Sequence, residues 1–493
     1  MPWKPRPLLY VACGVVLFGC AGSATGTAAA GAPQDAGSAA SDAGSDAAVD
    51  AGSDAGVADA GLAAADAGSP PAPLEPVFYV DARSGSDAND GRTLAAAFKT
   101  LNRAAAAVKP GWTVRVMGGT YSSEGGANPL TLSTSGTHGA WIRFVAADGQ
   151  HPVVRIPRGA WAGIQILGAS YVSIDGFEVV GLNGSITPAE AAANDGTQAS
   201  LNHNGIFVDG VGYGNVHPPL PHDIVIRNSI IHDCAGAGIE VNAGDAITIE
   251  RNRVYDNSWW TVFGTSGIGL YHLTDAPGST VQNGYKNFIT GNVSSGNRNN
   301  LPFLAGHPVA IYDGNGIIID DSMHAQAALG ANDVQYVPYT GRTYIANNLV
   351  HDNGGRGIHV NRSEHVDVVN NTAWNDLLST SDYLNAGEID AYGSADVHVV
   401  NNIAQNLVGK DVTLADGNPY SFNLWDGARV PYLGATDLIA PAGLIDPARG
   451  NFAPRPDSPA LRSGTGTLAP ADDFFGTARR AGAVDRGAVQ VSR

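Results

Sequence analysis

A short pattern, Asn-x-apolar-x-x-[Asn/Asp], returns with small departures between residues 228 and 407. Consecutive copies are as close as 23 residues, from Asn348 to Asn371, and as far apart as 56 residues, from Asn292 to Asn348. Repeats at this period are typical of solenoids, in which each repeat packs only on its neighbours. We interpret the shortest interval as one coil of a parallel β-helix and the longer intervals as coils with added loops. The copies begin at Asn228, Asn252, Asn292, Asn348, Asn371 and Asn402.

Each asparagine turn is followed by glycine and a short strand with alternating apolar residues, as in Gly238-Ile-Glu-Val-Asn242 and Gly357-Ile-His-Val-Asn361. Side chains alternate between the two faces of a strand, so one set is buried and the other faces outward. We expect the asparagines themselves to stack as an internal ladder, with each amide bonded to the backbone of neighbouring coils. The expected inward set is Ile239, Val241, Ile358, Val360 and Ile389, and the outward set is Glu240, Asn242, His359, Asn361, Glu388 and Asp390.

The N-terminus carries targeting signals. Basic residues precede an apolar run over residues 8–18 that is too short to span a bilayer. The run closes with Leu17-Phe18-Gly19-Cys20, which resembles the lipobox of bacterial lipoproteins. That resemblance implies a signal peptide over residues 1–20, lipidation of Cys20, and a membrane contact through the lipid anchor only. The expected location is the bacterial outer membrane or cell surface, with the folded domain extracellular or periplasmic.

Residues 21–76 consist largely of Ala, Gly, Ser, Asp and Pro. Such a segment has little to bury and is expected to be a disordered tether. The net charge of −18 argues against nucleic acid as a partner, because its binders need a basic surface. Cys234 is the single cysteine outside the N-terminal signal, so we expect a buried thiol and no intrachain disulfide. We also expect the protein to be a monomer.

The two ends of the folded part, residues 77–489, carry recognisable segments. Near the start, residues 98–108 have helical periodicity, which predicts a helix that caps the first coil. The opening Phe78-Tyr-Val-Asp-Ala-Arg-Ser-Gly-Ser-Asp-Ala-Asn-Asp-Gly91 and the closing Ala481-Gly-Ala-Val-Asp-Arg-Gly-Ala488 resemble those of right-handed parallel β-helix proteins of the pectate-lyase-like superfamily, including polysaccharide lyase family 9. The expected fold is therefore an all-β, right-handed parallel β-helix with an N-terminal capping helix.

The long inserted coils between Asn252 and Asn348 point to the functional region, because insertions in a solenoid gather on its binding face. The strongest candidate there is the adjacent pair Asp320 and Asp321, which ends a strand of consecutive isoleucines. Neighbouring acids repel unless a cation or a shared proton relieves them, or unless Asp321 instead caps the next segment. On the next coil His359 is expected within one hydrogen bond or one water of Asp320. The candidate catalytic residues are Asp320, Asp321, His359, Glu240 and Glu388.

Two chemistries remain open from these residues. Glu240 and Glu388 each lie two coils from Asp320, about 9.6 Å along the stack, which is near the upper end for inverting glycosidases. The family 9 resemblance implies instead a lyase in which aspartates hold calcium, and Asp313, Asp320 and Asp321 are the matching residues. The lysine base of that family has no counterpart on this face, because Lys286 is expected on a different one.

The remaining candidates would bind substrate. Arg356 and Arg362 are suited to grip a uronate carboxylate, and Trp259 and Trp260 could stack on sugar rings, with loop packing as the alternative. Tyr271, His272 and Asp390 complete the predicted set. These observations predict a surface enzyme that cleaves an extracellular, acidic polysaccharide by lyase or hydrolase chemistry. The alternatives are a non-catalytic glycan-binding or adhesive module, and a calcium site that only stabilises the stack.

Overall fold

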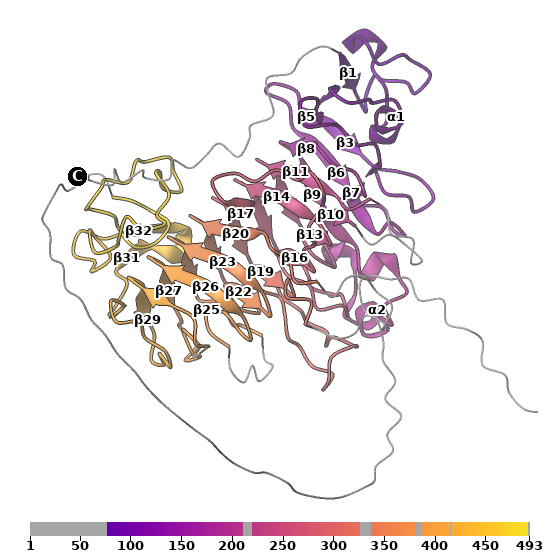
Figure 1. Ribbon diagram of the computed structural model, residues 1–493. Helices are drawn as coiled ribbons and strands as arrows, with labels where there is room; N and C mark the ends of the chain where they lie inside the picture. Colours follow the sequence, from indigo (N-terminus) through magenta and orange to yellow (C-terminus); the bar gives the residue numbers. More distant parts are fainter. Residues whose placement is uncertain (1–75, 211–218, 326–336, 380–385, 415, 492–493) are drawn as a thin grey trace, which may run out of the picture. The chain divides into compact units, whose positions relative to one another are not determined.

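The computed structural model describes residues 76–210, 219–325, 337–379, 386–414 and 416–491 (Figure 1). The predicted signal peptide, Cys20 and all of the predicted tether except Pro76 lie outside the described residues. None of the helices in these ranges is long and apolar enough to cross a membrane.

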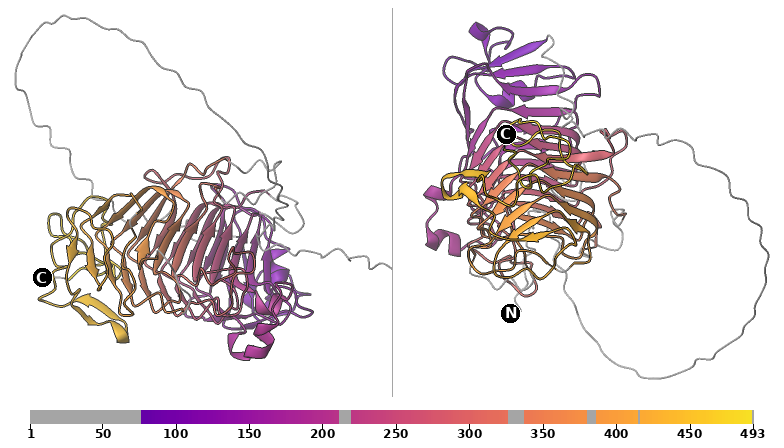
Figure 2. Two further views of the ribbon diagram at one scale, coloured as in Figure 1. Left: turned by 90° about the horizontal axis from the view of Figure 1, so that it is seen from below. Right: turned by 90° about the vertical axis from the view of Figure 1, so that its left-hand side faces the viewer.

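Three long parallel sheets wind around one core, and successive coils stack along the chain (Figures 1 and 2). Sheet I contains β1 (Val77–Val80), β2 (Thr113–Val116), β5 (Ile142–Ala146), β8 (Val172–Asp175), β11 (His222–Arg227), β14 (Asp245–Glu250), β17 (Tyr285–Thr290), β20 (Arg342–Ala346), β23 (Glu364–Val369), β26 (Ala395–Val400) and β28 (Tyr420–Ser421).

Sheet II has eight strands: β4 (Leu130–Leu132), β7 (Ala162–Leu167), β10 (Asn204–Asp209), β13 (Ile239–Asn242), β16 (Ile268–Tyr271), β19 (Ile317–Asp320), β22 (Ile358–Asn361) and β25 (Ile389–Asp390). Sheet III contains β3 (Gly119–Tyr121), β6 (Pro152–Arg155), β9 (Glu178–Val180), β12 (Ile230–His232), β15 (Arg253–Tyr255), β18 (Val293–Ser295), β21 (Leu349–His351), β24 (Thr372–Trp374), β27 (Ile403–Gln405), β29 (Leu424–Asp426) and β30 (Leu438–Ile439). An antiparallel pair, β31 (Leu444–Asp446) and β32 (Asn451–Pro454), lies near the C-terminal end.

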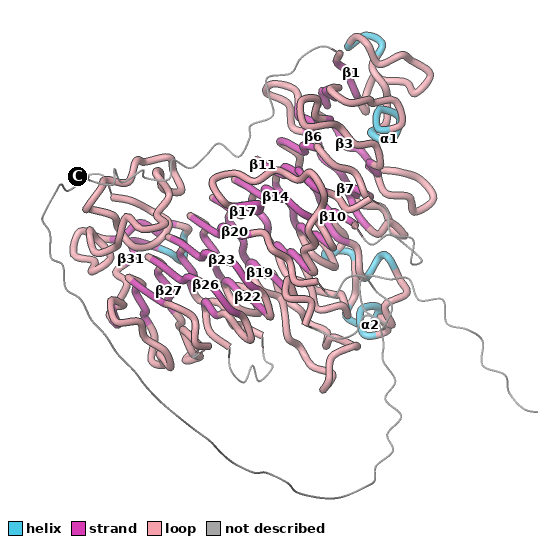
Figure 3. The backbone as a smooth tube through the Cα atoms, viewed as in Figure 1, coloured by secondary structure: helices cyan, strands magenta, loops and turns pink. Residues whose placement is uncertain are grey.

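Strands dominate the described chain, and its α-helices are short (Figure 3). Helix α1 (Leu101–Ala105) lies at the β1 end, with Leu101 buried in the same core as Phe98. It begins later than the predicted range of 98–108, because Thr100 caps its N-terminus and accepts the backbone N–H of Arg103, and it ends at Ala105. Helix α2 (Pro188–Ala192) belongs to a loop between sheets III and II. The predicted β-helix fold is confirmed.

The core is built from columns of aliphatic side chains in register. On sheet II one column joins equivalent isoleucines of seven consecutive strands, all fully buried: Ile164, Ile206, Ile239, Ile268, Ile317, Ile358 and Ile389. Each buried isoleucine contributes about 1.5–3 kcal/mol relative to an exposed one. The predicted inward set is confirmed, and Cys234 is a free, buried thiol as expected.

The predicted asparagine ladder is also present. Asn292 Oδ1 accepts the backbone N–H of Asn252 at 2.9 Å, while its Nδ2 donates to Ile249 O at 2.9 Å. This exchange repeats at Asn348, Asn371, Asn402 and Asn423. The prediction was wrong for Asn228, whose side chain is exposed. Ser229 occupies the ladder position instead, and its backbone N–H donates to Asn252 Oδ1.

A second ladder explains why glycine directly precedes β13, β16, β19 and β22 of sheet II. It runs through Asn257, Asn297, Asn353 and Asp376. A Cβ on Gly267 would lie 2.5 Å from Asn297 Nδ2, and one on Gly357 would lie 2.6 Å from Asp376 Oδ2. Glycine is therefore required where the strand start meets the ladder, and this contact fixes the register of sheet II.

Candidate active site

The outer face of sheet II carries two rows of side chains, set by the parallel register of its strands. The first row is Phe207, Glu240, Gly269, Ile318, His359 and Asp390. The second row is Asp209, Asn242, Tyr271, Asp320 and Asn361. Most of the site residues predicted for this face therefore lie on it together, but they are aligned with other partners than the sequence predicted.

The pairing of His359 was predicted wrongly. The register aligns His359 with Ile318, two residues before Asp320, and the Nδ1 atom of His359 bonds to Asp390 instead. Asp320 is aligned with Asn361, whose Nδ2 donates to Asp320 Oδ1 at 2.7 Å. The predicted Asp320–His359 contact is therefore replaced by a His359–Asp390 pair and an Asn361–Asp320 pair.

Asp321 was expected to face outward, and this is wrong. Its φ of 56° places it in a left-handed turn directly after β19, and its side chain is fully buried. Its Oδ1 accepts the backbone N–H of Ala325 at 2.8 Å, and its Oδ2 lies 3.3 Å from His272 Nε2. Asp321 therefore caps the following segment. His272, predicted to bind substrate, is likewise buried, with its ring 4.0 Å from that of His324.

Glu388 was also predicted to face outward and is fully buried. Its Oε1 accepts Asn406 Nδ2 at 2.7 Å and the backbone N–H of Asp376 at 3.2 Å. Burial and the neighbouring Asp376 carboxyl raise the pKa of Glu388 well above its usual value. The residue precedes β25, where the chain is still in the bend, so its side chain joins the end of the second ladder and is no candidate catalyst.

Asp390 and Arg356 hold each other and His359, so neither has the predicted role of a substrate ligand. Arg356 Nε donates to Asp390 Oδ2 at 2.8 Å, and Asp390 is 1% exposed. Although burial alone would raise it, Arg356 and His359 lower the pKa of Asp390 to about 2. Asp390 is consequently a buried anion that fixes the orientation of the histidine.

His359 is held as a neutral imidazole. Burial and the adjacent Arg356 lower its pKa, against the opposing effect of Asp390. Because the Asp390 carboxylate accepts from Nδ1, the proton is assigned to Nδ1 and the lone pair to Nε2. Within the described residues Nε2 has no hydrogen-bond partner, so His359 has the form of a general base.

Three acids with raised pKa values lie beside this pair. Burial, followed by the charges of Asp320 and Asp313, raises the pKa of Glu240 to about 8. Burial and Asp313 raise the pKa of Asp320 to about 7, against the effects of Asn361 and Arg362. Burial raises the pKa of Asp313 to about 6, against the effect of Arg356. All three side chains are half-buried, which leaves them partly open to solvent.

Gly269 determines where the Glu240 carboxyl lies. A Cβ on Gly269 would be 2.5 Å from Glu240 Oε2, so the glutamate extends across the next strand into the space that a side chain would fill. Tyr271 lies beside it, and burial together with Asp320 raises the pKa of its phenol. Tyr271 therefore keeps its proton and is a hydrogen-bond donor among acids.

Trp259 and Trp260 hold loops in place, as the packing alternative proposed. Trp259 Nε1 donates to Gly296 O at 3.1 Å, and Trp260 packs against the cluster that contains Ile186 and Leu201. Their stacking on a sugar stays a prediction.

The predicted metal ligands do not form one set. Asp313 and Asp320 face the same region, whereas Asp321 turns away into its capping contact. Among the residues that the structure describes, no group of three His, Cys, Asp or Glu side chains could hold a metal ion. Lys286 is on sheet I, where it donates to Asp245 and Asp275, so it supplies no base here. The donor set does not fit calcium, and no chemical step is assigned to it.

Asn361 and Gly269 were missed as functional residues. Aligning the glycines that precede each strand, such as Gly316 and Gly357, would have paired Asp320 with Asn361 and His359 with Ile318. The signal for this correction was therefore present in the sequence.

Comparison with known proteins places this fold among β-helices. A family model described as right handed beta helix region matches residues 158–423. A solved pectate lyase, Pel9A, is similar with a TM-score of 0.51 and 18% identity over 85% of this chain and 97% of that one. A rhamnogalacturonan lyase is similar with a TM-score of 0.41 and 16% identity over 75% of this chain and 91% of that one.

A lacto-N-biosidase from Eubacterium ramulus is similar with a TM-score of 0.40 and 16% identity, over 71% of this chain and 56% of that one. No curated protein sequence matches the chain significantly. At these identities the likeness to Pel9A concerns the fold, and function has to be argued from the site.

Proposed function

This chain belongs to the right-handed β-helix family, and we propose that it is a glycoside hydrolase that cleaves a polysaccharide on the outer face of sheet II. One observation carries the proposal. Glu240 and Asp320 are half-buried carboxyls on the same face, and their pKa values are raised to about 8 and about 7. Perturbed carboxyl pairs of this kind are the acid and base of glycosidases.

Glu240 is the general acid in this proposal. A pKa of about 8 keeps its carboxyl protonated at neutral pH, ready to protonate the glycosidic oxygen. Asp320 is the general base, because it has the lower pKa of the two and Asn361 donates a hydrogen bond to its carboxylate. The two groups interact, so the pair titrates as a unit in which Asp320 ionises first.

The spacing favours direct attack by water, with inversion at the anomeric carbon. The two residues lie in rows offset by about 7 Å in the direction of the strands. Because Glu240 extends over Gly269, its carboxyl is separated from Asp320 by about one strand spacing, ~5 Å, in the direction across the strands. The carboxyls are then roughly 8 Å apart. Inverting glycosidases need about 6.5–9.5 Å to admit a water between acid and base.

β-Elimination is the second candidate, and the observation that favours it is the neutral His359 imidazole oriented by Asp390. A lyase must also neutralise the uronate carboxylate next to the proton it removes. Arg356 is already paired with Asp390, and the other arginine of this face, Arg362, lies beside the ring of Tyr392. We therefore rank elimination below hydrolysis.

The test is a screen of the purified protein on pectate, alginate, glycosaminoglycans and neutral glucans. Hydrolysis releases reducing ends without the ultraviolet absorbance of an unsaturated product, and Glu240→Gln and Asp320→Asn should both abolish it. Unsaturated products that persist in Glu240→Gln and vanish in His359→Ala would establish elimination instead. Binding of these polysaccharides without any cleavage would favour the non-catalytic module. Added calcium and a chelator, in parallel, test the metal that the family resemblance implies.

We further propose that the enzyme acts at the cell surface, anchored through lipid on Cys20. Metabolic labelling with a fatty acid should mark the parent chain and leave Cys20→Ser unlabelled. Labelling of both would overturn the anchor without affecting the assignment of the site.

A further inference from the structure

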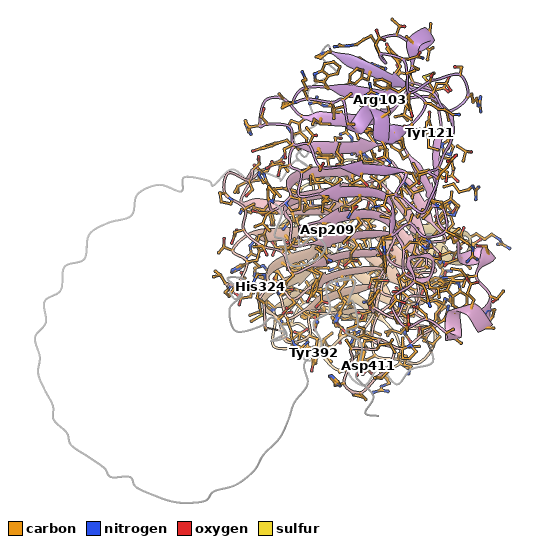
Figure 4. The ribbon with its side chains drawn as sticks, turned by 90° about the vertical axis from the view of Figure 1, so that its right-hand side faces the viewer. Arg103, Tyr121, Asp209, His324, Tyr392 and Asp411 are labelled. Atoms are coloured by element: carbon orange, nitrogen blue, oxygen red, sulfur yellow. The ribbon has the colours of Figure 1, made fainter. Side chains whose placement is uncertain are left out.

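Tyr392 extends the second row of sheet II beyond Asn361. The backbone N–H of Arg362 donates to Tyr392 O at 2.9 Å, as that of Asp321 donates to Asn361 O and that of His272 donates to Asp320 O. Tyr392 is thus one strand beyond Asn361 and two beyond Asp320, and in Figure 4 it follows Asp209 and His324 along the stack. Ala391, before it, is fully buried, so the alternation of the strand continues and turns Tyr392 outward.

Tyr392 differs from the other tyrosine of this row. Tyr271 lies beside Asp320 and its ring stacks on buried His272 at 5.2 Å, whereas Tyr392 is 43% exposed. A tyrosine ring held by the backbone at the edge of a site offers a flat apolar face to a ligand at little cost in conformational entropy. Sugar rings present C–H groups that pack on such a face.

Arg362 lies beside this ring. Its guanidinium carbon is 5.9 Å from the Tyr392 ring centroid, and its Cγ is 3.4 Å from the position of a Cβ on Gly393. Its charge lowers the pKa of Asp320 and of His359. Unlike Arg356, it forms no ion pair with any acid in the described ranges.

We propose that Arg362 and Tyr392 form a binding subsite for a uronic acid residue of the substrate, two strands from Asp320 towards the C-terminal end. The pyranose ring packs on Tyr392, and its carboxylate pairs with the Arg362 guanidinium, whose planar fork matches a carboxylate. This inference rests on the proposed function and narrows it, because it selects acidic polysaccharides and assigns their recognition to one arginine. Arg356, the other arginine predicted from the sequence, is excluded by its pairing with Asp390.

The subsite also couples binding to catalysis. A carboxylate bound at Arg362 offsets the positive charge that lowers the pKa of Asp320. The pKa of the base therefore rises when an acidic substrate binds, so the acid limb of the kcat profile lies at higher pH than that of kcat/KM. A purely structural role of Arg362 would not produce this separation.

The test measures binding in the full chain carrying Glu240→Gln, by calorimetry. Oligogalacturonate, oligoguluronate and oligoglucuronate are the probes, each compared with the same oligosaccharide after chemical reduction of its carboxyls. Arg362→Gln and Tyr392→Ala remove the two contacts, Tyr392→Phe retains the ring, and Arg449→Gln is the matched control, since Arg449 is exposed and far along the chain. Melting temperatures confirm that each variant is folded.

The expected result is that at least one acidic probe binds and that Arg362→Gln weakens it by roughly tenfold to a hundredfold. Tyr392→Ala should weaken the same probe, whereas Tyr392→Phe and Arg449→Gln should not. The reduced probe should bind weakly and be insensitive to Arg362→Gln. Equal binding of acidic and reduced probes, or no effect of Arg362→Gln, would overturn the subsite.

Failure of this inference is separable from failure of the proposed hydrolysis. Cleavage without a preference for carboxylated probes overturns the subsite alone. A preference for carboxylated probes that depends on Arg362, without any cleavage by the parent enzyme, overturns hydrolysis and leaves the subsite standing.

Discussion

Two charged surfaces of the solenoid differ in how nearby cations balance their acidic side chains. On the outer face of sheet I, Asp367 accepts from Arg342 and from His398, and Asp396 accepts from His365 and Arg342. Burial raises the pKa of Asp396, but its cationic partners outweigh this effect and hold the pKa below its usual value. We call this group, Arg342, His365, Asp367, Asp396 and His398, the compensated cluster.

The balance is different at the acids on the sheet II face. Burial and Asp313 raise the pKa of Asp320 to about 7, and they outweigh Asn361 and Arg362, which lower it. Burial and the charges of Asp320 and Asp313 raise the pKa of Glu240 to about 8. Acids that only stabilise a fold are normally matched with cations, whereas local electrostatic conflict marks functional sites. The contrast predicts that substitutions in the compensated cluster affect stability, and that substitutions of the sheet II acids affect activity.

The largest expected effect is the loss of activity in Glu240→Gln and Asp320→Asn. Removal of a general acid or base costs about 10³-fold in kcat/KM. Reducing-end release measures the loss, and thermal unfolding should show a melting temperature no lower than that of the parent. A marked loss of stability would mean that these acids stabilise the fold, as we expect for the compensated cluster.

Asp367→Asn should show the reverse behaviour. Asp367 is 1% exposed and is paired with Arg342, so neutralising it removes one of the two carboxylates that balance this partly buried cation. We expect about 3 kcal/mol of lost unfolding free energy in urea. The kcat/KM should remain that of the parent, and a fall in kcat/KM comparable to that of Glu240→Gln would remove the distinction between the two surfaces.

Gly269→Ala probes the space that the Glu240 side chain occupies. The added Cβ would lie 2.5 Å from Glu240 Oε2, the mobile end of a side chain, so folding should suffer little. Displacement of the acid should lower kcat/KM by roughly tenfold to a hundredfold. Gly139→Ala is the control, because a Cβ there meets nothing within 4 Å. Equal activity in both variants would show that the position of Glu240 is not set by Gly269.

The last effect concerns the pH dependence of stability. Glu240 has a folded pKa of about 8 against 4.5 for the free side chain, so the unfolded chain loses its proton first. Glu240 therefore makes the folded state progressively less stable as pH rises from about 4.5 to about 8. The parent melting temperature should fall more steeply over this window than that of Glu240→Gln. Parallel curves would show that Glu240 ionises at its ordinary pKa.

Structural features that follow from a repeat along the chain were predicted correctly, whereas contacts that depend on the register between strands were predicted less well. Alternation placed Ile239 and Ile358 in the core, and the recurring asparagines predicted the ladder, because both are local periodicities. The pairing of His359 failed because it depends on how one coil aligns with the next. That alignment is set by contacts between glycines and the second ladder, over tens of residues of chain.

The errors at Asp321 and Glu388 have a different cause. Both sit just beyond the ends of strands, where alternation no longer applies. Asp321 has a left-handed backbone, and Glu388 is still in the bend, so both side chains turn into the protein. Polar residues at strand ends can be assigned to a face only after the turn geometry is known.

The most direct test of the contrast between the two surfaces is reducing-end release from one acidic polysaccharide by the parent, Glu240→Gln and Asp367→Asn, with thermal unfolding measured on the same samples. If Glu240 is the general acid and Asp367 stabilises the fold, Glu240→Gln is inactive and as stable as the parent, and Asp367→Asn is active and less stable. Full activity in a folded Glu240→Gln would contradict this contrast.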